Sequence, residues 1–139
     1  LQMNIQELAT VIRHNLPIKI FLTNNHGHGM TQQTQDQWLE SKYFSTSVKG
    51  GLASPDFLKI AKAYGFKTVN IARNNEANEK IKEVLKTKGP VFCNVEIKPE
   101  HRVIPQVKLG RPNEDQEPSL DRKEFLENMI VKPLDISLK

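Results

Sequence analysis

A run of side chains that could bind a metal ion or a phosphate lies in the sequence FLTNNHGHGM, near the N-terminus. Asn25 carries an amide oxygen, a hard ligand that suits Mg²⁺, whereas His26 and His28 offer nitrogens that suit Zn²⁺ or Cu²⁺ better. Gly27 and Gly29 would let the backbone approach a ligand closely, and successive N–H groups there can form an anion-binding concavity. Three interpretations therefore compete: a histidine metal site, a plain turn, and a loop that holds a phosphate with its metal ion.

A structural zinc site would require four ligands. Apart from the two loop histidines, only His14, His101 and Cys93 could complete it, and none lies at a diagnostic spacing. Cys93 lies in the apolar run PVFCNVEI, which is typical of a small buried residue, and a single cysteine suits a reducing cytoplasm. For His28 two interpretations stay open, an exposed or hydrogen-bonded loop histidine and a contact to a cofactor. Asn24 is interpreted as a turn former or a strand-end hydrogen-bond partner.

A predicted helix and a predicted strand lead into this loop. Helical spacing of apolar residues in MNIQELATVIRHNLP predicts a helix that ends near Asn15, and Asn4 with Glu7 resembles a capping box. The run IKIFLT at 18–23 suits a central strand of a parallel sheet. Because ligands bind at the carboxyl ends of such strands, the loop is in a suitable place for a site. A helix predicted in TQQTQDQWLE would then direct its positive end at a bound phosphate.

The same alternation of helix and strand continues to about residue 98. SPDFLKIAKAYG predicts a helix with Ser54 as its N-cap and Gly65 as its stop, followed by a strand in FKTVNIA. NEANEKIKEVLKTKG predicts a helix that stops at Gly89, followed by the strand PVFCNVEI. This pattern of βαβ units predicts an α/β fold with three α/β/α layers, in which helices cover both faces of a mainly parallel sheet.

From Pro99 the sequence changes character. Four prolines from Pro99 to Pro118 and little periodicity predict an extended tail rather than a second domain. A short helix is predicted in DRKEFLENMIV with Asp121 as its cap, and its apolar face must dock on the domain's own core or on a missing domain or partner chain. We therefore predict a domain over residues 1–105 and a C-terminal tail over 106–139.

Composition narrows the classes of function. The 139 residues are 37% hydrophobic and 26% charged, and no apolar run approaches the roughly 18 residues that a membrane span requires. Lys and Arg number 20 against 16 Asp and Glu, and this excess is spread along the chain without the basic block of a nucleic-acid-binding surface. We expect a soluble, cytoplasmic protein that binds neither a membrane nor nucleic acid. The start LQMNIQEL carries no signal peptide and indicates a fragment of something longer.

The segment LQMNIQELATVIRHNLPIKIFLTNNHGHGM resembles the diphosphate-binding domain of thiamine diphosphate enzymes of the acetolactate synthase type. PDFLKIAKAYGFK and GPVFCNVEI are similar to a later helix and the last strand of that domain. The resemblance implies a thiamine diphosphate-binding fold that is truncated at its N-terminus. In this family a Gly-Asp-Gly motif precedes the Asn pair, so that motif, with its metal-binding aspartate, would lie just upstream of Leu1.

The resemblance also implies how the loop binds its cofactor. The Asn25 side-chain oxygen and the Gly27 carbonyl would bind the Mg²⁺ that bridges the diphosphate of thiamine diphosphate. The backbone at His28, Gly29 and Met30 would lie against that diphosphate, as the anion-binding concavity independently allows. Loss of the aspartate should remove most of the metal affinity of the isolated chain.

One departure from the family pattern concerns the substrate. Acetolactate synthases carry a valine and a tryptophan where this sequence has Thr31 and Thr34, and that tryptophan helps to select the second keto acid. Acetolactate as the product therefore does not follow from the resemblance. Trp38 lies one helical turn further on, and we interpret it as a packing residue.

The resemblance implies a part of an enzyme whose cofactor carries out the chemistry. A glutamate of a separate pyrimidine-binding domain, on the partner subunit, would activate the cofactor, so no catalytic residue is assigned to this chain. We expect the diphosphate- and magnesium-anchoring part of a transferase or lyase that acts on a 2-keto acid by carboligation or decarboxylation. The parent protein would be a homodimer or homotetramer, and the isolated chain would be inactive. The alternative is an inactive α/β binding or interaction module that has kept the fold.

Overall fold

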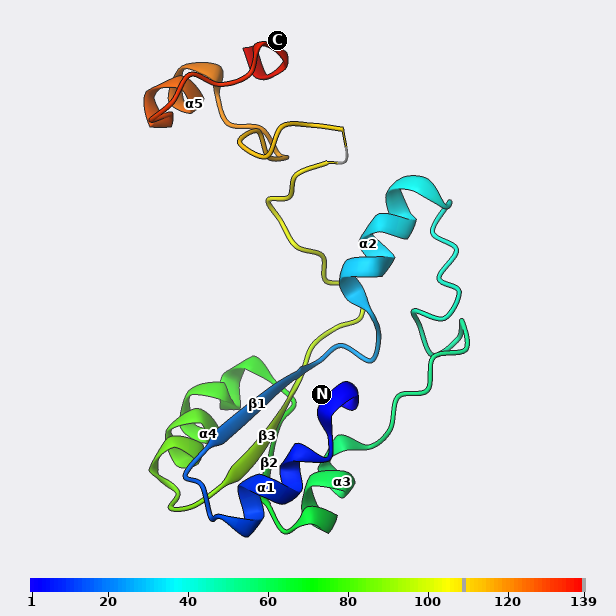
Figure 1. Ribbon diagram of the computed structural model, residues 1–139, viewed down its shortest axis with the longest axis vertical. Coiled ribbons are helices and arrows are strands. Elements are labelled where there is room, and N and C mark those ends of the chain that lie inside the picture. The colour runs from blue at the N-terminus through cyan, green and yellow to red at the C-terminus, as the bar shows by residue number, and fades with distance from the viewer. Residues whose placement is uncertain (109, 139) are drawn as a thin grey trace. The chain divides into compact units, whose positions relative to one another are not determined.

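The computed structural model describes residues 1–108 and 110–138 (Figure 1). The chain divides into two compact units, Leu1–His101 and Arg102–Lys139. The boundary that the sequence predicts after residue 105 stays a prediction.

The first unit is built on a sheet of three parallel strands in the order β1-β3-β2. These strands are β1 (Lys19–Asn24), β2 (Lys67–Ile71) and β3 (Val91–Glu96). The predicted central place of the strand at 18–23 is wrong for this sheet, because β3 is central and β1 is at an edge. The reason is burial: the first four residues of β3 are buried, whereas the side chain of Phe21 in β1 is 38% exposed.

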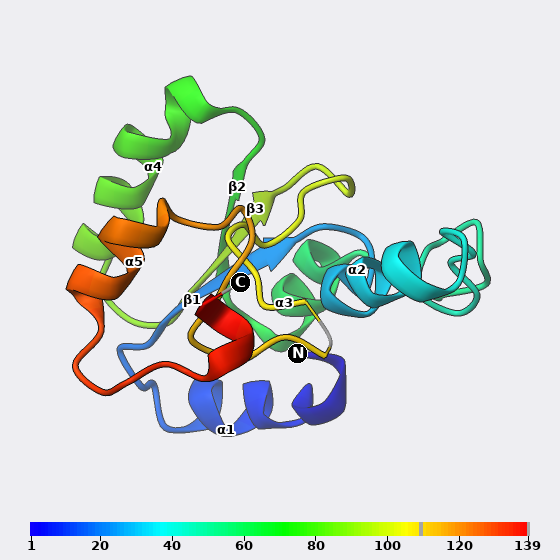
Figure 2. The ribbon, with the colours of Figure 1, turned by 90° about the horizontal axis from the view of Figure 1, so that it is seen from above.

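Helices cover both faces of this sheet (Figure 2). The first unit contains the helices α1 (Glu7–Arg13), α2 (Gly29–Trp38), α3 (Phe57–Tyr64) and α4 (Asn74–Lys86), of which α1, α3 and α4 pack on the sheet. Side chains of α1 and α3 pack on Phe92 of β3 at one face. Val84 of α4 packs on Val91 and Cys93 at the other face. Because neighbouring strand residues point to opposite faces, one strand supplies both hydrophobic clusters. The predicted three-layer α/β/α fold with a parallel sheet is confirmed.

The structure corrects two predicted helix starts. Asn4 closes a short 3-10 helix, η1 (Gln2–Asn4), and α1 is capped by Gln6 without a side-chain hydrogen bond, so the capping box with Glu7 is absent. Helix α3 is capped by Asp56 rather than Ser54, because the Asp56 Oδ1 accepts a hydrogen bond from the Lys59 N–H at 3.0 Å. Local sequence offers several capping side chains near each start, and the path of the preceding loop selects among them.

The predicted helix ends agree better with the structure. Gly65 ends α3 with φ +99°, a left-handed conformation that glycine adopts without strain. Helix α4 ends at Lys86, three residues before Gly89, and its C-cap is Thr87. Helix α1 ends at Arg13, close to the predicted Asn15.

The second unit contains α5 (Arg122–Asn128) and a 3-10 helix, η2 (Asp135–Leu138). Asp121 caps α5 by accepting hydrogen bonds from two backbone N–H groups of its first turn, as predicted. The unit is compact where the sequence predicts an extended tail. Its centre is Asp115, which is 3% exposed and accepts hydrogen bonds from Arg111 at 2.7 Å and Arg122 at 3.1 Å. These ion pairs join residues four and seven positions apart, and charged pairs of this kind are not visible in hydrophobic periodicity.

The apolar face of α5 is only partly covered within the second unit. Phe125 is 4% exposed, and the Arg122 guanidinium lies 4.7 Å from the centre of its ring. Leu126 and Ile130 are exposed. Within the described ranges, no helix has the length and apolar character needed to span a membrane.

Candidate functional site

The loop after β1 is held by its own asparagines. Asn24 is buried at the end of the strand, and its Oδ1 accepts a hydrogen bond from the His26 N–H at 3.2 Å. The Asn25 Oδ1 accepts a bond from the Gly27 N–H at 3.3 Å. Such bonds from an Asn side chain to the backbone two residues on stabilise a turn. The predicted role of Asn24 as a turn former is therefore confirmed.

A Cβ added to either glycine of the loop would come close to neighbouring atoms. A Cβ on Gly27 would come within 2.7 Å of the Gln32 Nε2 and 2.9 Å of the Thr46 carbonyl oxygen. A Cβ on Gly29 would come within 2.7 Å of the Asn25 Nδ2. Contacts this short require atoms to shift. The loop is therefore packed against its own side chains and against the segment around Thr46.

That segment fixes the start of α2. The His28 N–H donates to the Thr46 carbonyl at 2.9 Å, and the buried Gln32 side chain donates to the same oxygen at 2.6 Å. His28 is the N-cap of α2 and its side chain makes no capping bond. The first N–H groups of the helix, beginning at Gly29, are thus available to an anion beside the loop.

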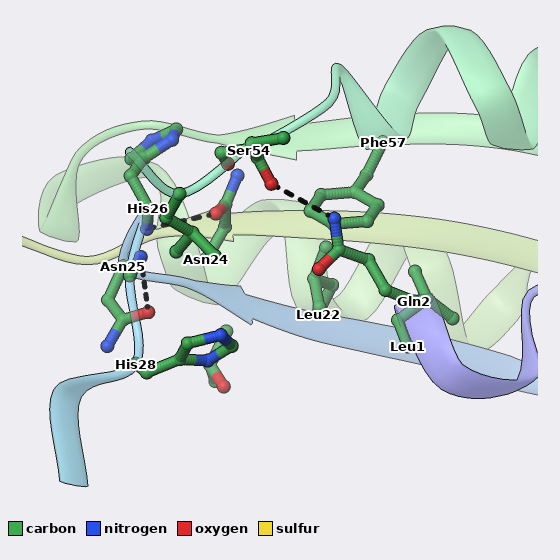
Figure 3. A pocket seen from close by; sticks show the side chains of 13 residues that line it. Leu1, Gln2, Leu22, Asn24, Asn25, His26, His28, Ser54 and Phe57 are labelled. Carbon is green, nitrogen blue, oxygen red and sulfur yellow. Dashed lines mark hydrogen bonds between the residues drawn. The ribbon is translucent and has the colours of Figure 1, made fainter. Parts of the chain in front are cut away.

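Two cavities lie at the carboxyl edge of the sheet. The first has a volume of about 140 Å³, and Figure 3 shows that the loop, β1 and the start of α3 supply its walls. Asn24, Asn25 and His28 line it, with Phe57 of α3. The second has a volume of about 370 Å³ and lies beside the first residues of α3. The position at the strand ends is the one in which α/β folds bind their ligands.

A chain of polar side chains that the sequence did not reveal lies beside the second cavity, which His26, Asn94 and Glu96 line. The His26 Nε2 lies 2.7 Å from the Glu96 Oε2, at the end of β3. The Asn94 Nδ2 donates to the Glu96 Oε1 at 2.6 Å and to the Asn70 Oδ1 at 2.9 Å. Strand pairing brings His26 to Glu96 and Asn70 to Asn94, which are 70 and 24 positions apart, whereas Asn94 and Glu96 are two positions apart on β3. The available signal was the polar Asn94 within the otherwise apolar run PVFCNV.

The predicted site residues Asn25, Gly27, His28 and Gly29 lie together in the loop and at the first position of α2. Met30, on the first turn of α2, is 68% exposed. Their roles in binding Mg²⁺ and diphosphate stay predictions.

The remaining candidates that the sequence offers are Cys93, a histidine metal site and Trp38. Cys93 is completely buried, as predicted, and burial raises the pKa of its thiol, so the reactive thiolate is disfavoured. Among the described residues, no group of three or more His, Cys, Asp or Glu side chains could hold a metal ion. The packing role predicted for Trp38 is not seen, because its side chain is 57% exposed.

The fold and the loop together define an α/β cofactor-binding domain. A sequence model of the family described as "Thiamine pyrophosphate enzyme, C-terminal TPP binding domain" matches residues 1–95. The chain belongs to this family. It is thus a thiamine diphosphate-binding domain of the acetolactate synthase type, as the resemblance implied.

The chain is similar to acetolactate synthases of algae and yeasts. It is 30% identical to the acetolactate synthase large subunit of Cyanidium caldarium over 112 residues. This alignment covers 81% of this chain and 19% of that protein. It is 35% identical over 108 residues to the mitochondrial acetolactate synthase catalytic subunit of Saccharomyces cerevisiae, over 78% of this chain and 15% of the relative. The mitochondrial acetolactate synthase of Schizosaccharomyces pombe is 37% identical over 105 residues, which are 76% of this chain and 15% of that protein. The chain thus spans less than a fifth of the length of these relatives.

Proposed function

We propose that this chain is the diphosphate- and magnesium-anchoring part of a thiamine diphosphate-dependent enzyme. The Asn25 Oδ1 and the Gly27 carbonyl oxygen bind Mg²⁺, and the backbone at His28, Gly29 and Met30 faces the diphosphate. The observation that carries this proposal is the loop at the carboxyl end of β1, where an amide oxygen lies beside the uncapped start of a helix.

The residues that are present fit these two groups. Amide and carbonyl oxygens are hard ligands of the kind that Mg²⁺ accepts, and Mg²⁺ commonly completes its shell with waters and substrate phosphates. The Asn25 Oδ1 accepts one long hydrogen bond, at 3.3 Å, and so keeps a lone pair for a cation. The missing Cβ of Gly29 leaves room for the Asn25 amide, and the N–H groups that open α2 suit a phosphate oxygen.

The work of this chain is binding and orientation. When bound, thiamine diphosphate supplies the stabilisation of carbanions. The loop fixes the charged end of the cofactor to the carboxyl edge of a rigid sheet, so that the position of its other end is set by the fold. No side chain of this chain is assigned a catalytic role.

For the whole protein we propose a transferase or lyase that acts on a 2-keto acid by carboligation or decarboxylation. Support comes from the relatives, which are named acetolactate synthases. A pyrimidine-binding domain and a homodimeric or homotetrameric assembly belong to the same proposal, as does a cytoplasmic location. The alternative of an inactive interaction module draws no support from these relatives.

The test is a titration of thiamine diphosphate, with and without Mg²⁺, into the full-length protein that carries this chain and into its Asn25→Ala variant. With Mg²⁺ we expect at least about 10-fold weaker binding in the variant, because one metal ligand is lost. Without Mg²⁺ the two affinities should converge. Asn75→Ala, an exposed residue of α4, is the matched control and should bind as the unchanged protein does. Equal Mg²⁺-dependent affinity in Asn25→Ala and the unchanged protein would refute the assignment.

A further inference from the structure

The backbone of His26 has a conformation that its residue type does not favour. Its φ is +53°, in the left-handed region where a side chain carrying a Cβ is strained. His26 lies between Asn25 and Gly27, the two proposed metal ligands. Such a conformation persists only where the surrounding structure holds it. The contacts of His26 therefore bear on the geometry of both ligands.

Glu96 provides the main side-chain contact of His26. Its Oε2 lies 2.7 Å from the His26 Nε2. Glu96 is the last residue of the central strand β3, and its Cα pairs with that of Asn24 in β1. The Asn24 side chain in turn accepts the backbone N–H of His26. His26 is thus held at the ends of two adjacent strands. Its backbone N–H bonds the Asn24 side chain of β1, and its ring bonds the Glu96 side chain of β3.

Asn94 fixes the Glu96 carboxylate from the other side. The side chain of Asn94 donates to the Glu96 Oε1 and to the Asn70 Oδ1, at 2.6 and 2.9 Å. Turning this amide by 180° would place its oxygen against the Glu96 carboxylate, which when ionised can only accept, so the orientation follows from that contact. Asn94 is 2% exposed, and its own Oδ1 is buried without a hydrogen-bond partner among the described residues.

That unpaired oxygen argues against a purely stabilising role for Asn94. A buried acceptor without a donor destabilises a fold, and an apolar side chain of similar volume would avoid the penalty. The benefit that offsets it is local, because both N–H groups of the amide are used to hold neighbouring side chains. One of these is the carboxylate that contacts the proposed metal-binding loop.

We propose that Glu96 is a positioning residue for this loop: acting through His26, and supported by Asn94, it keeps Asn25 and Gly27 in the conformation that binds Mg²⁺ and diphosphate. The inference rests on the proposed function for its ligand, and it adds Asn94 and Glu96 of β3, two residues that are outside the loop itself. The expected consequence is that β3, which contributes no proposed ligand, controls the affinity of the site.

The first experiment measures Mg²⁺-dependent binding of thiamine diphosphate to full-length Glu96→Ala and Glu96→Gln variants. We expect about 10-fold weaker binding in Glu96→Ala, as is typical when a support of a metal ligand is removed. Glu96→Gln keeps an oxygen for one neighbour and should bind with intermediate affinity. Glu83→Ala, at an exposed glutamate of α4, is the control and should not change the affinity.

The second experiment separates positioning from stability. In Asn94→Leu the unpaired oxygen is removed together with both donated bonds, two changes with opposite effects on stability, so we expect little change in resistance to urea together with weaker Mg²⁺-dependent binding. In the cofactor-free protein, both Glu96→Ala and Asn94→Leu should speed hydrogen exchange of the Gly27 and His28 amides. A variant that loses stability and affinity in parallel, with exchange raised throughout the first unit, would contradict positioning.

The outcomes also distinguish this inference from the proposed function. If Asn25→Ala loses affinity while Glu96→Ala and Asn94→Leu keep both affinity and amide protection, the positioning role is refuted and the metal assignment stands. If Asn25→Ala keeps its affinity, the proposed function fails. Faster exchange at Gly27 and His28 in Glu96→Ala would then still show that Glu96 holds the loop.

Discussion

At the scale of one residue, Gly29 offers a test of the site, because a Cβ added there would come close to the Asn25 amide. In Gly29→Ala the new Cβ would lie 2.7 Å from the Asn25 Nδ2 and would displace that side chain. The crowded atom is the end of the Asn25 side chain, which can turn away, and alanine is favoured over glycine in helices, so the free energy of unfolding should change little. We expect weaker Mg²⁺-dependent binding of thiamine diphosphate with unchanged thermal stability. Gln37→Ala, exposed on the same helix, is the control, and unchanged binding in Gly29→Ala would contradict the role of Asn25.

At the scale of elements, one buried cluster packs α1 and α3 on the sheet. Phe92 of β3 is completely buried, and its ring meets that of Phe66 edge to face at 6.3 Å. Phe92→Ala should lower the free energy of unfolding in urea by roughly 3–5 kcal/mol, because a large buried side chain is removed. Phe44→Ala removes a ring that is 73% exposed and should change it by less than about 0.5 kcal/mol. Similar losses in both variants would show that this cluster is not the core.

At the scale of the whole molecule, the second unit has its own dependence on pH. The guanidinium groups of Arg122 and Arg111 lower the pKa of the Asp115 carboxyl. Because the unfolded chain then binds the proton more readily, this stabilisation is complete above about pH 5 and is lost progressively as the pH falls through the unfolded value of about 3.9 and then the lowered pKa. Limited proteolysis should cut the second unit faster below about pH 4. Asp115→Asn should be cut faster already at pH 7 and should respond less to acid. The control is Asp135→Asn, because Asp135 forms an exposed ion pair with Lys132 at 3.8 Å. This variant should behave as the unchanged protein does.

Local sequence was sufficient wherever the determining interactions are local. The periodicity of apolar residues identified α3, α4 and α5, because a helix satisfies its backbone within its own segment. The left-handed stop at Gly65 and the cap at Asp121 were predictable for the same reason, since each acts within a few residues. The alternation of helices and strands also determined the parallel, three-layer arrangement. The position of the loop at a strand end followed directly from that alternation.

Tertiary structure alone decided which strand is central and which distant side chains hold the loop. The order β1-β3-β2 depends on burial from both faces, which residue types at 18–23 did not report. The contacts of His26 with Glu96, and of Asn94 with Asn70, depend on the pairing of segments that are 70 and 24 residues apart. Such contacts form only after chain segments have paired, and no spacing within either segment encodes them. The sequence by itself therefore determined the loop and its proposed ligands, whereas the fold decided what positions them.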